Sequence, residues 1–194
     1  SRVETGVSGV SPATFQALME HAGAPCERYP VFAGREDFDC YYALKHVRFY
    51  LDAWQTEPAW QELQKLEDKN WADNRLYYQE WLLLHSRLQY CTCCYDHSQN
   101  YMTLSEALHV TRPHINLSDF GVLLLSGNEI QILTALAQEA LYLDRKTECH
   151  EILTQLESYL RDRKLTSLEK ERMLADVAIV RVKYLIAAGD YSTA

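Results

Sequence analysis

The stretch YCTCCYDH holds the residues of this sequence that could bind a metal ion or react with an oxidant. Cys91, Cys94 and His97 follow one another at intervals of three, so a helix would place two thiols and an imidazole on one face, and zinc binds such ligands. Structural zinc sites usually take two ligand pairs from separated segments, and no second pair lies nearby. We therefore predict no metal, and interpret Cys91, Cys93 and Cys94 as small apolar core residues or as redox-sensing thiols at a helix end.

Motifs of known catalytic sites are missing from the sequence. It holds no glycine-rich phosphate loop, no Gly-x-Ser-x-Gly elbow and no His-Glu-x-x-His helix, and its seven histidines are scattered along the chain. Carboxylates are plentiful, but on amphipathic helices a run of charges is usually a solvated face. We predict that the protein is not an enzyme and has no cofactor.

Composition limits where the chain works and what it contacts. A hydrophobic fraction of 47% with 24% charged residues is typical of a globular protein, and no run approaches the roughly 18 apolar residues that a membrane span needs. The six cysteines lack the even spread of a small secreted domain, so we expect a cytoplasmic protein without a membrane partner. The net charge of −8 opposes contact between the body of the chain and nucleic acid.

The elements that must position any site are predicted to be helices. Apolar residues recur every three or four positions in one segment after another, and glycine and proline are few. Ser126 with Glu129 forms a capping box at a helix start, and Pro113 ends the preceding helix. After a short helix within residues 11–23, the predicted helices cover residues 38–54, 57–66, 71–94, 98–110, 126–143, 147–163 and 166–188.

Short turns join these helices into antiparallel pairs. In LYLDRKTECHEIL and YLIAAGDYSTA alike, a helix ends on apolar residues, a tight turn follows, and a small residue begins the packing face of the next segment. Helix pairs that cannot cover their own apolar faces stack on their neighbours. The sequence therefore predicts a curved solenoid whose concave side is lined by the first helix of each pair, where an extended peptide can lie.

Polar stripes at helical spacing supply the candidate ligand-binding residues. Side-chain amides and hydroxyls can hold the backbone of an extended peptide without demanding one sequence, although a plain solvated face is the alternative for each residue. Arg181 is a further candidate, for a peptide carboxylate. The predicted peptide-binding residues are Tyr78, His85, Gln89, Gln131, Thr134, Gln138, Asp176 and Lys183.

Two segments carry a resemblance to known families. GDYSTA is similar to the turn and second-helix signature of tetratricopeptide (TPR) repeats, and residues 1–23 resemble the closing part of a Cro- or lambda-repressor-type helix-turn-helix domain of the XRE family. The whole chain resembles cytoplasmic regulators of the Rgg and PlcR type, which bind a short signalling peptide in their repeat domain. The positions that match the helix-turn-helix pattern are Ser1, Glu4, Gly6, Ser11, Pro12, Leu18 and Gly23.

The resemblance implies a domain organisation and a function. Residues 1–23 would be the remnant of a helix-turn-helix DNA-binding domain, 24–36 a linker, and 37–194 a right-handed TPR-like sensor domain truncated at its C-terminus. It implies a quorum-sensing transcription regulator that binds a peptide, contacts DNA through the mostly absent N-terminal head, and forms a homodimer because two such heads read two-fold-related half-sites. The alternatives are a TPR-like protein-interaction scaffold without a role on DNA, and, for residues 1–23, a capping helical hairpin.

Overall fold

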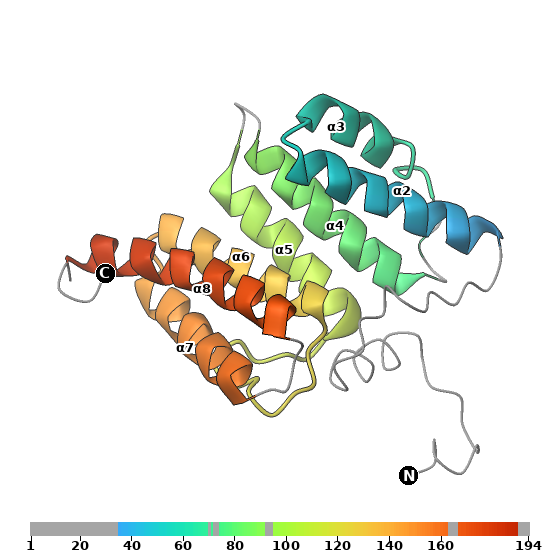
Figure 1. Cartoon of the computed structure of the whole chain (residues 1–194). Coiled ribbons are helices and arrows are strands. Elements are labelled where there is room, and N and C mark those ends of the chain that lie inside the picture. Colours follow the sequence, from blue (N-terminus) through green and yellow to red (C-terminus); the bar gives the residue numbers. More distant parts are fainter. Residues whose placement is uncertain (1–34, 70, 72–73, 92–94, 163–166, 190–194) are drawn as a thin grey trace, which may run out of the picture.

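The computed structural model describes residues 35–69, 71, 74–91, 95–162 and 167–189 (Figure 1). The predicted helix-turn-helix remnant, most of the predicted linker and the last five residues lie outside these ranges. All secondary structure within them is helical, which confirms the predicted all-α class. The helices are α2 (Arg35–Asp52), α3 (Thr56–Gln64), α4 (Arg75–Tyr90), α5 (His97–Thr111), α6 (Gly127–Tyr142), α7 (Lys146–Asp162) and α8 (Ser167–Ala188).

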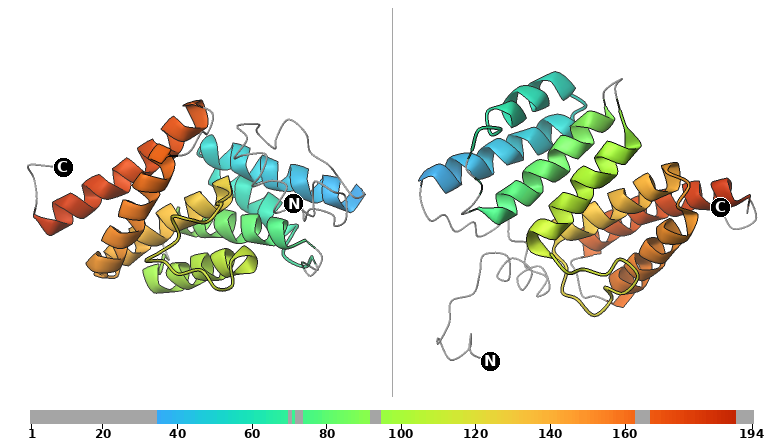
Figure 2. Two further views of the ribbon diagram at one scale, coloured as in Figure 1. Left: turned by 90° about the horizontal axis from the view of Figure 1, so that it is seen from below. Right: turned by 180° about the vertical axis from the view of Figure 1, so that it is seen from behind.

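Each helix packs against the helix that follows it in the sequence, and the even-numbered helices also pack against one another. Helix α2 packs on α3, α4 on α5, and α6 on α7, while α2, α4, α6 and α8 contact one another in that order. Figure 1 shows α4 and α5 as antiparallel neighbours, and the two views of Figure 2 show α2 and α8 at the two ends of this series. The even-numbered helices therefore form one continuous layer, which α3, α5 and α7 flank.

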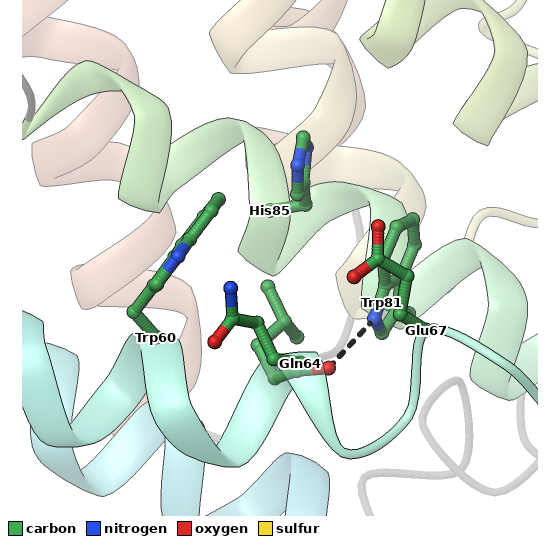
Figure 3. A pocket seen from close by; sticks show the side chains of 6 residues that line it. Trp60, Gln64, Glu67, Trp81 and His85 are labelled. Atoms are coloured by element: carbon green, nitrogen blue, oxygen red, sulfur yellow. Dashed lines mark hydrogen bonds between the residues drawn. The ribbon is translucent and has the colours of Figure 1, made fainter.

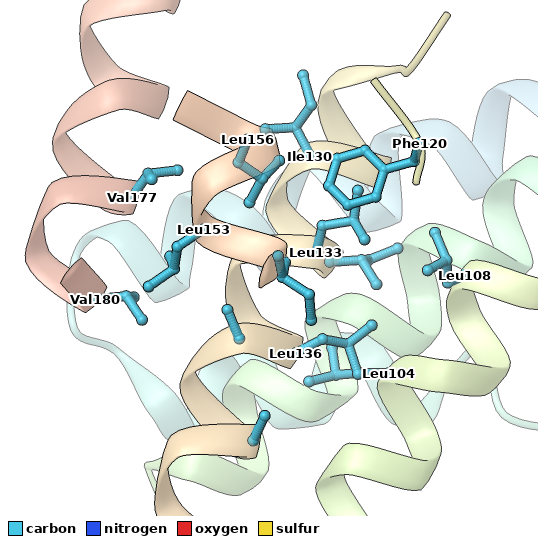
Figure 4. Packing of buried hydrophobic residues seen from close by; sticks show 14 of the residues in the cluster. Leu104, Leu108, Phe120, Ile130, Leu133, Leu136, Leu153, Leu156, Val177 and Val180 are labelled. Atoms are coloured by element: carbon cyan, nitrogen blue, oxygen red, sulfur yellow. The ribbon is translucent and has the colours of Figure 1, made fainter. Parts of the chain in front are cut away.

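Two clusters of buried apolar residues hold the helices together. The larger joins α4 to α8 and contains Leu104, Leu133, Leu136 and Leu153, none of which exposes more than 1% of its surface (Figure 4). The smaller joins α2, α3 and α4. Burial of one such leucine stabilises the fold by about 1.5–3 kcal/mol. Helix α4 contributes to both clusters and therefore joins α2 and α3 to the helices α5 to α8.

A long connection between α5 and α6 is part of the core. Phe120 is fully buried, and the backbone N–H groups of Phe120 and Gly121 donate to Gln155 Oε1 of α7 at 2.8 and 3.2 Å. The backbone N–H of Leu125 donates to the Tyr159 hydroxyl at 2.8 Å. Because these bonds satisfy backbone groups that no helix could pair, α7 fixes the connection and thereby the start of α6.

Side-chain caps set the helix starts that the sequence predicted. Ser126 and Glu129 form the expected capping box at α6, and Asp96 accepts from the backbone N–H groups of Ser98 and Gln99 at the start of α5. Helix α5 ends at Thr111, two residues before the proline. None of the helices in the described ranges combines the length and the apolar character that crossing a bilayer requires.

Candidate functional site

Charged and amide side chains from all four even-numbered helices meet in one network. We call it the polar cluster. Its members come in pairs from α2, α4, α6 and α8, and several of them are half-buried although they carry a charge. The polar cluster consists of Arg48, Asp52, Glu80, Arg87, Asn128, Gln131, Arg172 and Asp176.

Arg48 connects three helices. From α2 its guanidinium donates to Glu80 Oε1 of α4 at 2.6 Å, to Asn128 Oδ1 of α6 at 2.7 Å and to Gln131 Oε1 at 3.3 Å. The side chains of Arg48 and Glu80 are only 19% and 16% exposed. A guanidinium presents its donors in a rigid planar fork, so this one residue fixes the spacing of α2, α4 and α6.

Asp52, the last residue of α2, forms a second connection, to α4 and to α8. Its Oδ1 lies 3.5 Å from Arg87 Nη2, and its Oδ2 lies 3.8 Å from Arg172 Nη2. Burial lowers the pKa of Arg87, Arg48 and Arg172 lower it further, and Asp52 opposes this shift. A guanidinium stays charged in proteins, so Arg87 is a half-buried cation beside the carboxylate of Asp52.

Asp176 is the acidic member contributed by α8. Partial desolvation raises the pKa of Asp176, and the positive charges of Arg172 and Arg87 oppose that effect. The polar cluster therefore contains three guanidinium groups and three carboxylates beside two side-chain amides. Such a surface can pair with the charged ends of a ligand and hold its amide groups.

Four of the predicted peptide-binding residues lie on α6 and α8 near one another. Gln131 and Asp176 belong to the polar cluster. Gln138 accepts a hydrogen bond of 2.9 Å from Lys183 Nζ, which lies 5.9 Å from the ring centroid of Tyr142. The hydrogen bond between Gln138 and Lys183 joins α6 to α8.

The other predicted residues lie elsewhere. Thr134 is 8% exposed and its hydroxyl donates to the backbone of its own helix. The Tyr78 hydroxyl donates to Glu106 of α5 at 2.5 Å. Burial, together with this hydrogen bond and the charge of Glu106, raises the pKa of Tyr78 to about 12. His85 lies between two tryptophan rings on the α3 side of α4, and Gln89 is half-buried near the end of α4.

Arg181, the candidate for a peptide carboxylate, already has a carboxylate partner. Its Nε lies 2.8 Å from Glu157 Oε1, and its Nη groups contact His150 and Thr154 of α7. The guanidinium therefore joins α8 to α7, and it does not belong to the polar cluster.

Sequence reasoning missed the members of the polar cluster on α2 and α4. A usable signal was present, because Arg48 and Asp52 are four residues apart and Glu80 and Arg87 are seven apart, spacings that place both members of a pair on one helix face. Helix α4 carries two partly polar stripes. The sequence analysis predicts binding by the stripe with Tyr78, whereas Glu80 of the other stripe bonds to Arg48 of α2.

The residues considered for metal or redox chemistry are only partly described. His97 Nδ1 lies 2.8 Å from Glu139 Oε2, and its ring stacks on Tyr142 at a centroid distance of 4.5 Å. Glu139 is buried and also accepts a hydrogen bond from the Tyr95 hydroxyl. Cys91 is exposed, while Cys93 and Cys94 lie outside the described residues, so redox sensing at this cluster stays a prediction.

Comparison with known proteins yields no match: no family model, no curated protein and no solved structure is similar to the chain at a significant level. No family is assigned to the chain on the basis of these comparisons.

Proposed function

We propose that this chain is the peptide-binding and dimerising part of a bacterial transcription regulator, built as a TPR-like right-handed solenoid of antiparallel helix pairs. The packing order supports the solenoid. In a stack of helix pairs, the first helix of each pair contacts the first helix of the next pair, and α2, α4, α6 and α8 contact one another in this order. The resemblance of residues 1–23 to the XRE family supports the link to DNA, and those residues lie outside the described ranges.

The observation that carries the peptide-binding proposal is the polar cluster. Extended peptides need partners for their backbone amides and for their charged ends, and Asn128, Gln131 and Gln138 supply amides on one helix. Arg87 supplies a half-buried guanidinium, which lies 3.5 Å from the Asp52 carboxylate. A short peptide with a free carboxylate matches both kinds of group.

Peptide binding would shift the fold between two curvatures. Arg48 and Asp52 each connect helices that do not follow one another in the chain. A peptide that replaced some of these contacts would favour the arrangement in which the helices lie further apart, since a ligand shifts an equilibrium by its differential affinity for the two states. In a cytoplasmic homodimer, that change would reposition two DNA-reading heads.

Native mass spectrometry on protein purified from its own source tests this proposal. We expect a homodimer that retains a short peptide, and we expect the peptide to be lost from the Gln131→Ala and Gln138→Ala variants. Gln61→Ala is the matched control, because Gln61 is an exposed amide of α3 that donates to Glu57 of the same helix and lies outside the polar cluster. A protein that retains no peptide, or one that retains it equally in all three variants, contradicts peptide binding at this surface.

A TPR-like interaction scaffold without a role on DNA is the second candidate, because the same polar cluster could hold a segment of a partner protein. Selection of genomic DNA fragments by the protein purified from its own source separates the two. Enrichment of a two-fold symmetric site supports the regulator, and recovery of random fragments supports the scaffold.

A further inference from the structure

The hollow between α3 and α4 is too small to hold a ligand (Figure 3). Its free space is about 20 Å³, which is room for roughly one water molecule. The ring of His85 occupies the space between Trp60 and Trp81, at centroid distances of 5.4 and 5.1 Å. This hollow therefore takes no ligand side chain, and the surface of α6 and α8 offers other groups.

Lys183 of α8 is a half-buried cation without a carboxylate partner among the described residues. Its ammonium donates to Gln138 Oε1 at 2.9 Å and lies 5.9 Å from the centroid of the Tyr142 ring. The guanidinium of Arg87, in contrast, already lies 3.5 Å from the Asp52 carboxylate. An ammonium has three N–H donors, so Lys183 keeps both donors and charge for an added anion.

Two tyrosines lie beside this ammonium. Tyr90, the last residue of α4, is 47% exposed, and Tyr142, the last residue of α6, is 44% exposed. A hydrogen bond to Tyr142 is the largest cause that raises the pKa of Tyr90, and the charge of Lys183 opposes the shift. Such a bond stabilises the protonated phenol, so Tyr90 donates, and the O–H of Tyr142 is left without an acceptor among the described residues.

The ring of Tyr142 is held in place by a neighbouring pair. The ring of His97 stacks on it at a centroid distance of 4.5 Å, and His97 Nδ1 lies 2.8 Å from Glu139 Oε2. Glu139 is buried and also accepts from the Tyr95 hydroxyl. The hydrogen bonds of this carboxylate are therefore taken up in the core, and the Tyr142 hydroxyl needs little ordering when a ligand binds.

Exposed aliphatic side chains lie on both sides of Lys183 along α8. Ile179, four residues before it, is 55% exposed, and Ile186, three residues after it, is 50% exposed. Residues three and four positions apart are neighbours on a helix surface, and burial of such apolar area is favourable. We call this feature the Lys183 surface, and it consists of Tyr90, Gln138, Tyr142, Ile179, Lys183 and Ile186.

We propose that the Lys183 surface binds the C-terminal carboxylate of the peptide, and that the last side chain of this peptide is aliphatic. The carboxylate accepts hydrogen bonds from the Lys183 ammonium and the Tyr142 hydroxyl, and the aliphatic side chain covers Ile179 or Ile186. An amidated end lacks the charge, and a phosphate gains nothing from the isoleucines. This inference rests on the proposed function, for which it names the end of the peptide that is recognised.

The same assignment gives the peptide a direction. Gln131 and Gln138 are seven residues apart on α6, as Asp176 and Lys183 are on α8, which corresponds to about 10 Å along each helix. An extended chain spans about 3.3–3.6 Å per residue. About three residues therefore separate the C-terminal carboxylate from the polar cluster, whose amides hold the preceding part of the backbone.

Titration of the 194-residue chain with N-acetyl-leucyl-leucine tests the inference, observed through the methyl signals of Ile179 and Ile186 by NMR. The comparison ligands are the C-terminal amide of the same dipeptide and octanoate. We expect saturable shifts with the free acid and at least tenfold weaker binding of the amide, which lacks the charge-assisted bonds. Equal binding of acid and amide, or no shift, overturns the inference. So does tighter binding of octanoate, because that would indicate a site for free aliphatic acids.

Lys183→Met is the decisive variant, because it removes the charge and keeps most of the length of the side chain. We expect it to bind the free acid at least tenfold more weakly and the amide as before. Lys65→Met is the matched control, since Lys65 is an exposed lysine of α3 paired with Glu62 at 2.5 Å. Thermal unfolding verifies that both variants are folded. Equal weakening in the two variants would mean that only the general charge of the surface attracts the acid, and would overturn the inference.

Native mass spectrometry separates a failure of this inference from a failure of the proposed function. A retained peptide that is lost from Gln131→Ala but kept by Lys183→Met would overturn the inference and leave the proposed function standing. A protein purified from its own source that retains no peptide would overturn both.

Discussion

At the scale of single residues, Glu129 shows how one buried carboxylate joins several elements. It is buried and accepts hydrogen bonds from Arg112 Nε at 2.8 Å, from the Thr111 hydroxyl at 2.7 Å and from the Ser126 backbone N–H at 2.8 Å. Thr111 in turn accepts from the buried Gln79 at 2.7 Å. One carboxylate thus caps α6 and joins it to α5 and α4.

Replacement of Glu129 by alanine should destabilise the protein by about 3 kcal/mol or more. The change removes a helix cap and leaves the partly buried Arg112 without its anion, and breaking a buried ion pair typically costs about 3–5 kcal/mol. Urea unfolding at pH 7 measures the effect. Glu151→Ala, at an exposed position of α7, should change stability by less than about 0.5 kcal/mol, and a similar small effect for both variants would refute the network as a source of stability.

The burial of His85 makes stability depend on pH. Its pKa in the folded protein lies below the ordinary 6.5 because burial disfavours the charged ring, with Glu67 as the opposing charge. The unfolded chain therefore binds more protons below pH 6.5, so the contribution of His85 is fully present above that pH and falls as the pH decreases toward the folded pKa. His85→Phe should show a smaller loss of unfolding free energy between pH 7 and pH 5 than the unmodified chain. Parallel curves would show that the histidine is not responsible.

At the scale of elements, two helices end on residues that are unfavourable in the left-handed conformation. Trp54 after α2 has a φ of 58° and Asp144 after α6 a φ of 59°, and each is followed by a backbone bond that closes the helix end, Gln55 N–H to Tyr50 and Arg145 N–H to Ala140. Glycine is the usual residue in this position, as Gly189 is after α8, with a φ of 77°.

Trp54→Gly should stabilise the protein by about 1 kcal/mol, because a bulky residue in this conformation costs roughly 1–2 kcal/mol and the side chain is 86% exposed, so little packing is lost. Asp144→Gly should gain less, since aspartate tolerates the conformation better. Thermal unfolding of the two variants checks the order of the effects. A larger gain at Asp144 would show that Trp54 makes contacts which offset its backbone cost.

The elements were easier to predict than the surfaces they present. The predicted helix 126–143 agrees with α6 to within one residue at each end, because a capping box and a strict apolar period both mark it. Helix α4 begins at Arg75 where 71 was predicted, because Trp71 belongs to an aromatic group packed against the helix. Tertiary packing decides which polar stripe of α4 faces α2. The helical spacing of polar residues in the sequence therefore could not show that the stripe with Glu80, and not the one with Tyr78, faces α2.

At the scale of the whole molecule, an ion pair joins the two ends of the helical layer. Arg172 near the start of α8 lies 3.8 Å from Asp52 at the end of α2, and the left view of Figure 2 shows these two helix ends side by side. The chain between them comprises α3 to α7. This ion pair therefore brings distant parts of the sequence together through the side chains of Arg172 and Asp52, which are 68% and 51% exposed.

Asp52→Asn should open this contact. Arg87 and Arg172 would lose their shared carboxylate, and together with Arg48 they would repel one another. Because the pairs are partly exposed, we expect a stability loss of only about 1 kcal/mol, but a larger radius of gyration by small-angle X-ray scattering and faster amide exchange at the start of α8. At 1 M salt, where charges are screened beyond about 3 Å, the difference from the unmodified chain should shrink. Asp119→Asn, an exposed change outside the network, is the control. An unchanged radius of gyration at low salt would mean that apolar packing alone holds the helices at their distances. The polar cluster would then not control the change of shape that the proposed function requires.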